Sequence, residues 1–227
     1  MNDIETNLQS IRARIESAAK ACGRDAGTVR LLAVSKTKPA AAIRVAAAAG
    51  QAEFGENYLQ EALHKMDELE DLDLCWHFIG AIQSNKTRPI AEAFDWVHCV
   101  DRLKIAQRLS DQRPAGRAPL NACIQVNLDN EDSKAGIALD VLPALAEAMA
   151  ELPGIRLRGL MTIPAPRDDY QAQCQSFARM TEALSSLEQQ GLDCDTLSMG
   201  MTGDMEAAIA QGSTLVRIGT AIFGERT

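Results

Sequence analysis

The sequence predicts an α/β fold, and within that class a single (β/α)8 TIM-type barrel with one extra helix at its N-terminus. Eight short apolar runs alternate with segments of helical periodicity over the 227 residues. No linker or low-complexity segment interrupts the chain, and its length suits one closed barrel, so we expect one domain over residues 1–227. An open doubly wound sheet would favour a glycine-rich turn after the first strand, whereas residues 35–38 read Ser-Lys-Thr-Lys.

The expected elements follow one another closely along the chain. The N-terminal helix is expected over about residues 3–22, because apolar residues recur at helical spacing from Ile4 to Ile15 and Gly23 provides a stop. Strands are expected at residues 31–34, 53–57, 74–80, 96–100, 120–127, 155–161, 196–200 and 214–218. Helices are expected at residues 39–49, 58–69, shortly after 86, 103–112, 140–151, 170–189 and 204–210. No helix is expected after the last strand, so we expect the N-terminal helix to cover that side of the barrel.

Composition disfavours several classes of function. The formal net charge of −8 argues against a nucleic-acid surface, because phosphate binding needs clustered lysine and arginine. The six cysteines form no CxxC pair and no Cys/His spacing suited to zinc, so we expect reduced, structural thiols and no metal. The N-terminus is polar and no apolar run approaches ~20 residues, which predicts a cytoplasmic protein without a membrane partner. The absence of a long exposed apolar run also favours a monomer.

The first strand ends close to a lysine. Residues 31–34 are all apolar, and Lys36 follows them directly before an alanine-rich helical segment. An ammonium at the end of a buried strand is costly to desolvate, so it needs an anionic partner or serves as an amine that forms a Schiff base with a carbonyl ligand. The alternative is a strand-end lysine whose ammonium reaches water, and this stretch alone favours that alternative.

Polar residues near the other strand ends are expected at the same rim of a barrel. With the adjacent Met161, they are Asn57, His77, Asn127, Thr162, Ser198 and Arg217. The last two loops, 198–203 and 217–220, are typical of a phosphate site in this fold. Gly200, Gly203 and Gly219 allow close backbone approach, and Ser198 and Thr220 supply hydroxyls. The alternative is that these glycines simply form tight turns.

A lysine amine, a phosphate site and a buried cation together fit pyridoxal 5′-phosphate as a cofactor. Arg217 would then face the ring nitrogen, disfavour its protonation and weaken the ring as an electron sink. The alternative roles for Arg217 are a phosphate clamp and an ion pair with a carboxylate at the rim. His98, which lies within a strand, is expected to be packed rather than catalytic.

Six motifs lie in order over nearly the whole chain: AVSKTKP (33–39), FGENYLQE (54–61), WHFIGAIQSNK (76–86), SKAGI (133–137), GLMTIP (159–164) and LSMGMTGDMEAAIAQGSTLVRIGTAIFG (197–224). Together they resemble the pyridoxal phosphate homeostasis protein family, whose fold is similar to the N-terminal barrel of alanine racemase. Two departures are Ala81-Ile82, where the family often has proline-leucine, and Thr202-Gly203, where it often has serine-aspartate.

The resemblance implies roles for individual residues. It implies that Lys36 forms the Schiff base with the cofactor and that Arg217 faces the pyridine nitrogen. Ser198, Gly219 and Thr220 would hold the phosphate, with Gly200 in the same loop region. Asn57 and His77 match motif positions near the cofactor.

The function predicted first is a reversible Schiff-base carrier of pyridoxal 5′-phosphate in intracellular homeostasis, with apo-enzymes that use this cofactor as candidate recipients. A racemase would need a second acid/base, and neither Tyr58 nor Tyr170 is an obvious candidate, so we expect no turnover. The alternatives are an amino-acid racemase with Lys36 as its base, and a cofactor-free enzyme that forms a Schiff base with a phosphorylated metabolite. Lys134 is a hypothetical second amine for handing over the cofactor.

Overall fold

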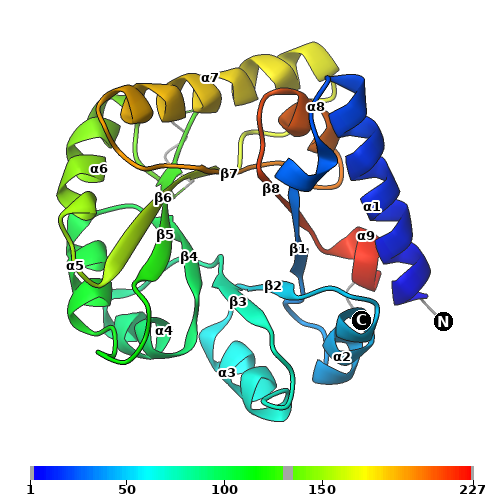
Figure 1. Cartoon of the computed structure of the whole chain (residues 1–227), viewed down its shortest axis with the longest axis horizontal. Helices are drawn as coiled ribbons and strands as arrows, with labels where there is room; N and C mark the ends of the chain where they lie inside the picture. Colours follow the sequence, from blue (N-terminus) through cyan, green and yellow to red (C-terminus); the bar gives the residue numbers. More distant parts are fainter. Residues whose placement is uncertain (1–2, 130–134, 226–227) are drawn as a thin grey trace.

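The computed structural model describes residues 3–129 and 135–225. Eight parallel strands close into a barrel in which each strand pairs with its neighbours in the sequence and β8 pairs with β1 (Figure 1). The strands are β1 Arg30–Val34, β2 Glu53–Glu56, β3 Cys75–Phe78, β4 Trp96–Val100, β5 Leu120–Val126, β6 Ile155–Thr162, β7 Thr196–Ser198 and β8 Leu215–Ile218. The predicted (β/α)8 barrel is confirmed.

Helices surround the barrel on the outside (Figure 1). They are α1 Ile4–Ala21, α2 Ala40–Ala48, α3 Leu59–Glu68, α4 Thr87–Ala93, α5 Leu103–Asp111, α6 Leu142–Ala150, α7 Tyr170–Gln189, α8 Met205–Ala210 and α9 Thr220–Phe223. Short 3-10 turns occur at Ala26–Thr28, Ser84–Lys86 and Leu139–Val141. No helix within residues 3–129 and 135–225 has the length and apolar character needed to cross a membrane.

The expectation that no helix follows the last strand is wrong, because the short helix α9 begins two residues after β8. The other part of that expectation holds: α1 packs beside α8 and α9 and covers this side of the barrel (Figure 1). Asn7 donates a hydrogen bond to the carbonyl of Ile222 at 2.9 Å, and Arg14 forms an ion pair with Glu206 of α8 at 2.7 Å. The N-terminal helix therefore takes the place that a longer eighth helix would fill.

The apolar core lies between the strands and the helices, while the barrel interior is largely polar and aromatic near its N-terminal end. Trp96 of β4 lies between two arginines: Arg30 and Arg158 each place a guanidinium carbon 4.7 Å from the centroid of its ring. His77 stacks on the same indole, with ring centroids 5.3 Å apart. This lining leaves little room for a ligand inside the barrel, so a ligand has to bind at one of its ends.

Candidate functional site

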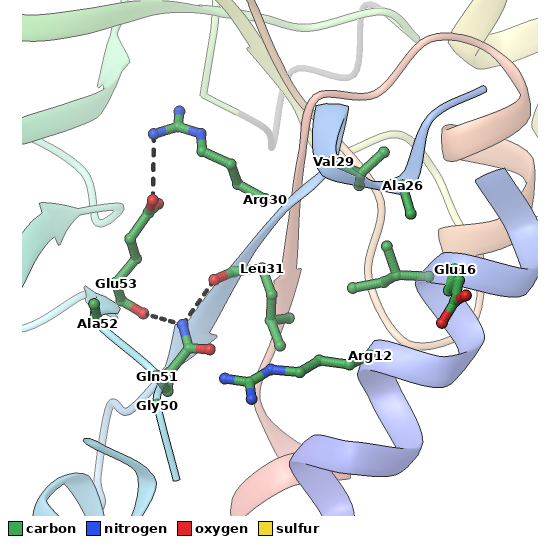
Figure 2. A pocket seen from close by; sticks show the side chains of 11 residues that line it. Arg12, Glu16, Ala26, Val29, Arg30, Leu31, Gly50, Gln51, Ala52 and Glu53 are labelled. Atoms are coloured by element: carbon green, nitrogen blue, oxygen red, sulfur yellow. Dashed lines mark hydrogen bonds and ion pairs between the residues drawn. The ribbon is translucent and has the colours of Figure 1, made fainter. Parts of the chain in front are cut away.

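A cavity lies at the N-terminal ends of β1 and β2. It measures about 430 Å³ and is bordered by α1, from which Arg12 and Glu16 reach toward it (Figure 2). The amide of Gln51 donates to the carbonyls of Leu31 and Glu53 at 2.7 and 2.8 Å and joins the two strands there (Figure 2). In barrels of this type the N-terminal end serves stability, and active sites lie at the other end.

A smaller cavity of about 240 Å³ opens at the C-terminal ends of the strands. Its lining residues are Val34, Lys36, Asn57, Ile79, Met161, Ile163, Met201, Thr202, Arg217, Gly219 and Thr220. Five of the eight residues predicted for the site are therefore brought together: Lys36, Asn57, Arg217, Gly219 and Thr220. Of the apolar wall, Met161 was predicted at the rim, whereas Ile163 and Met201 were not predicted as binding residues, and no polar pattern in the sequence singles them out.

Lys36 lies in the turn directly after β1 and is half-buried. The two residues that flank it are each held by a carboxylate. The hydroxyl of Ser35 donates to Oε1 of Glu56 at 2.6 Å, and the backbone N–H of Thr37 donates to Oε1 of Glu61 at 2.5 Å. Thr37 has a φ of 64°, the only positive φ at a non-glycine residue of the described chain. The carboxylates thus fix a strained turn that presents Lys36 to the cavity.

A buried lysine completes this support. Nζ of Lys65, on α3, lies 2.8 Å from Glu56, 2.5 Å from Glu61 and 2.9 Å from the carbonyl of Ser35. Burial raises the pKa of Glu56, and the hydrogen bonds from Lys65 and Ser35 oppose that shift. Lys65 was not among the predicted site residues, because a lysine in the middle of a helix is ordinarily solvated. The sequence does place Lys65 four residues after Glu61, and this spacing allows an ion pair on one face of a helix.

Asn57 lines the cavity and carries a polar atom that its surroundings leave unsatisfied. Its Oδ1 is buried and has no hydrogen-bond partner within residues 3–129 and 135–225. Gly80 packs so closely that a Cβ there would lie 2.2 Å from the carbonyl oxygen of Asn57. A buried unsatisfied amide in a cavity wall is suited to a hydrogen bond with a ligand.

Arg217 points from β8 to the base of the same cavity and is 5% exposed. Its guanidinium donates to the carbonyl and hydroxyl of Ser198 at 2.5 and 2.7 Å, and to the carbonyl of Thr162 at 2.8 Å. All three acceptors are uncharged, and burial lowers the pKa of Arg217 from its ordinary value. Such a cation is poised to interact with an electron-rich atom of a bound ligand.

The two C-terminal loops approach the cavity differently. Gly219 precedes α9 and lies against β1, where a Cβ would be 3.2 Å from the carbonyl oxygen of Val34. Thr220 begins α9 and is exposed. Gly200 has a φ of 98°, and a Cβ there would lie 2.7 Å from the Cβ of Ala208. Gly200 therefore serves the packing of its loop on α8, and it does not line the cavity.

Ser198 and His77 are fully buried and lie outside the cavity lining. The hydroxyl of Ser198 is engaged by Arg217 and by Nδ1 of His98 at 2.8 Å. His77 contacts Nε2 of His98 through its Nδ1 at 2.9 Å, inside the barrel. The structure thus places both residues behind Arg217 and brings His98 into contact with both. Lys134 lies outside the described residues.

Comparison with known proteins gives consistent results. The family model of the alanine racemase N-terminal domain matches residues 6–227. The chain is 64% identical over 226 residues to the pyridoxal phosphate homeostasis protein of Pseudomonas aeruginosa PAO1, which covers 100% of this chain and 97% of that protein. Its identity to the protein of the same name from Escherichia coli K12 is 56% over 229 residues, with 100% and 98% covered.

A solved structure agrees with these relatives. PipY of Synechococcus elongatus PCC7942, with PLP bound, superposes with a TM-score of 0.86 at 40% identity, over 98% of this chain and 100% of that one. The barrel, the matching motifs and the identity over the full length lead to one assignment. The chain belongs to the pyridoxal phosphate homeostasis protein family, within the alanine racemase N-terminal domain fold.

Proposed function

We propose that this chain binds pyridoxal 5′-phosphate reversibly through the Lys36 amine and acts as a carrier in the homeostasis of that cofactor. The observation that carries the proposal is the cavity at the C-terminal rim, which collects an amine, a buried guanidinium, a hydroxyl and an unsatisfied amide. Relatives at 56–64% identity carry the name pyridoxal phosphate homeostasis protein, and the PipY structure contains PLP.

The residues present fit this cofactor. When bound, pyridoxal phosphate supplies an aldehyde that an amine captures reversibly and an electron-withdrawing ring. Lys36 would hold the aldehyde carbon, and Asn57 would offer its unsatisfied amide to a ring substituent. Arg217 would face the ring nitrogen as a hydrogen-bond donor, while Gly219 and Thr220 would hold the phosphate. Met161 and Ile163 would cover the ring and exclude water.

The lining favours a carrier over a racemase. Lys36 and Arg217 are the titratable residues among the lining residues. Arginine does not release its proton in the neutral range, so it supplies no second acid/base. Tyr58 and Tyr170 are about half exposed and lie outside this cavity. An arginine at the ring nitrogen also disfavours protonation there and weakens the electron sink that turnover would need.

The first experiment is an absorption spectrum of the purified protein, repeated after borohydride reduction. We expect a visible band that reduction abolishes, with the cofactor mass fixed on the peptide that contains Lys36. Lys36→Ala should lack the band and the mass, whereas the matched control Lys38→Ala should keep both. A protein that gains no band when pyridoxal 5′-phosphate is added overturns the proposal and favours an enzyme acting on a phosphorylated metabolite.

A second experiment separates the carrier from the racemase with Lys36 as base. The cofactor-loaded protein is incubated with L-alanine in deuterium oxide, and exchange at Cα is followed by NMR. We expect exchange no faster than with free cofactor. Exchange clearly above that rate, lost in Lys36→Ala, would establish the racemase or a related activity instead.

The partners and state of the protein belong to the same proposal. We propose that apo-enzymes that use pyridoxal phosphate receive the cofactor from a monomeric, cytoplasmic carrier. Free thiols at all six cysteines suit a reducing compartment. Light scattering after size exclusion tests the monomer, and recovery of activity by an apo-enzyme mixed with the loaded chain tests the transfer.

A further inference from the structure

A chain of hydrogen bonds runs through the barrel interior behind the candidate site. It starts at Arg217, whose guanidinium donates to the hydroxyl of Ser198 at 2.7 Å. Ser198 Oγ lies 2.8 Å from Nδ1 of His98, and Nε2 of His98 lies 2.9 Å from Nδ1 of His77. Nε2 of His77 lies 3.3 Å from Sγ of Cys75 and 3.4 Å from Oε2 of Glu53. These hydrogen bonds thus run from the C-terminal end of the barrel, where the candidate site lies, toward its N-terminal end.

The arginine at one end of this hydrogen-bond chain fixes the direction of the protons along it. Arginine is a donor only, so Ser198 Oγ accepts from Arg217 and its own hydrogen is available for Nδ1 of His98. His98 then carries its proton on Nε2 and donates to Nδ1 of His77.

His77 in turn carries its proton on Nε2, which lies 3.3 Å from the sulfur of Cys75 and 3.4 Å from the carboxylate of Glu53. The reverse direction would need a donor at Nε2 of His77, such as the thiol of Cys75, and also another acceptor for the Ser198 hydroxyl. The guanidinium, which can only donate, therefore selects this pair of neutral tautomers.

The surroundings keep both imidazoles neutral and fixed. His77 and His98 are fully buried, and burial followed by neighbouring positive charges lowers the pKa of each well below its ordinary value. His77 also stacks on Trp96 with an angle of 7° between the rings. The charged and titratable groups that face the two imidazoles are Arg30 of β1, Glu53 of β2, Cys75 of β3 and Arg217 of β8. Burial, stacking and hydrogen bonds to both ring nitrogens therefore hold the two imidazoles in place.

We propose that His98 and His77 are positioning residues for Arg217, acting through the hydroxyl of Ser198. Arg217 is a buried cation held by uncharged acceptors, and the orientation of one of these, the Ser198 hydroxyl, is set by the hydrogen that it directs toward His98. Without the lone pair of His98, the Ser198 hydroxyl can rotate and loses its fixed orientation toward the guanidinium. This role rests on the proposed function, because it concerns the residue that would face the ring nitrogen.

The first test measures the tautomers directly and needs no substitution inside the barrel. The chain has three histidines, and the third, His64, is exposed on α3. In His64→Ala protein labelled with [15N]histidine, the two remaining imidazoles should both be neutral and protonated on Nε2. A proton on Nδ1 of either ring, or a charged ring at neutral pH, overturns the assigned direction. Ser198→Ala removes the hydroxyl that donates to Nδ1 of His98, so His98 should then show a mixture of tautomers.

The second test compares two substitutions of similar shape. Asn at position 98 can place an oxygen near the position of the imidazole Nδ1, whereas Leu offers no acceptor. We expect His98→Leu to weaken pyridoxal 5′-phosphate binding about tenfold and to shift the absorption maximum of the bound cofactor, with His98→Asn recovering most of both effects. The exposed His64→Leu serves as the control and should match the wild type.

The outcomes separate the two proposals. If the wild type binds the cofactor and both His98 variants bind as tightly as it does, the positioning role is wrong and the proposed function stands. If the wild type itself fails to bind, the proposed function falls, and the role given to the histidines falls with it. Should His98→Leu fail to fold, Ser198→Ala gives the same comparison in affinity against Ser198→Thr, which keeps the hydroxyl.

Discussion

Nζ of Lys65 lies 2.8 Å from Oε1 of Glu56, and the two side chains are only 5% and 0% exposed. This ion pair is located directly behind the turn that carries Lys36, because Glu56 also accepts from Ser35. A buried pair of this kind contributes little net stability compared with apolar side chains, but the removal of one partner is costly. Its position indicates that it maintains the geometry of the Lys36 turn.

We therefore expect Lys65→Met to lower the free energy of unfolding by about 3 kcal/mol, because Glu56 is left buried without its cation. Urea unfolding followed by circular dichroism measures the change. The matched control is Lys104→Met at an exposed position of α5, which should change stability by less than about 0.5 kcal/mol. Equal stability of Lys65→Met and the wild type would contradict the role of the pair.

The cost of Lys65→Met should also depend on pH. Burial raises the pKa of Glu56, and Lys65 opposes that shift, so its loss raises the folded-state pKa further. Where the folded pKa exceeds the unfolded one, the folded chain binds more protons, and stability falls as pH rises through that window.

The stability gap between the wild type and Lys65→Met should therefore be small near the unfolded glutamate pKa of ~4.3 and widen toward neutral pH. Urea unfolding of both proteins at about pH 5 and about pH 8 tests this expectation. Glu56→Gln removes the titrating group, so the stability gap between Glu56→Gln and Glu56→Gln combined with Lys65→Met should not change with pH. A gap that is the same at both pH values in the single variant would assign the cost to another group.

Gly80 supports the site by close packing. A Cβ there would lie 2.2 Å from the carbonyl oxygen of Asn57, so Gly80→Ala must displace the residue that presents the unsatisfied amide to the cavity. We expect a loss of about 2–3 kcal/mol in the free energy of unfolding and weaker cofactor binding. Gly203→Ala, where a Cβ would meet nothing within 4 Å, is the control for stability. Unchanged stability and affinity in Gly80→Ala would show that the loop can shift without cost.

The cysteines differ in predicted reactivity. Burial raises the pKa of Cys75, Cys99 and Cys123 to about 12, whereas Cys22 is exposed at the end of α1. Because the thiolate is the reactive form, iodoacetamide at about pH 8 should alkylate Cys22 faster than these three by a factor of about 100 or more. Mass spectrometry of peptides measures the order, and the difference should vanish in urea. Early labelling of Cys99 or Cys123 would mean that the barrel opens.

The barrel itself could be predicted because each strand is a short apolar run between helical segments, as at 96–100, where prediction and structure coincide. The four-residue helix α9 escaped prediction because it is too short to show helical periodicity. His77 was assigned to the rim from its place near a strand end, whereas Cys75 and His77 both contact the barrel interior. Alternation along the strand could have indicated this, but the partner of His77 comes from another strand, β4, and only the fold brings them together.

The guanidinium of Arg217 contacts two neighbouring strands, β7 at Ser198 and β6 at Thr162. A lysine there keeps the charge but not the planar fork that reaches both Ser198 and Thr162 at once. We expect Arg217→Lys to weaken pyridoxal 5′-phosphate binding at least about tenfold, measured by titration of the visible absorption band, and to destabilise the chain because buried carbonyls lose their donor. Arg14→Lys, at the half-exposed ion pair with Glu206, should leave the affinity unchanged. An Arg217→Lys protein with wild-type affinity would mean that charge alone is sufficient at this position, and that the fixed orientation of the guanidinium is not what the cofactor recognises.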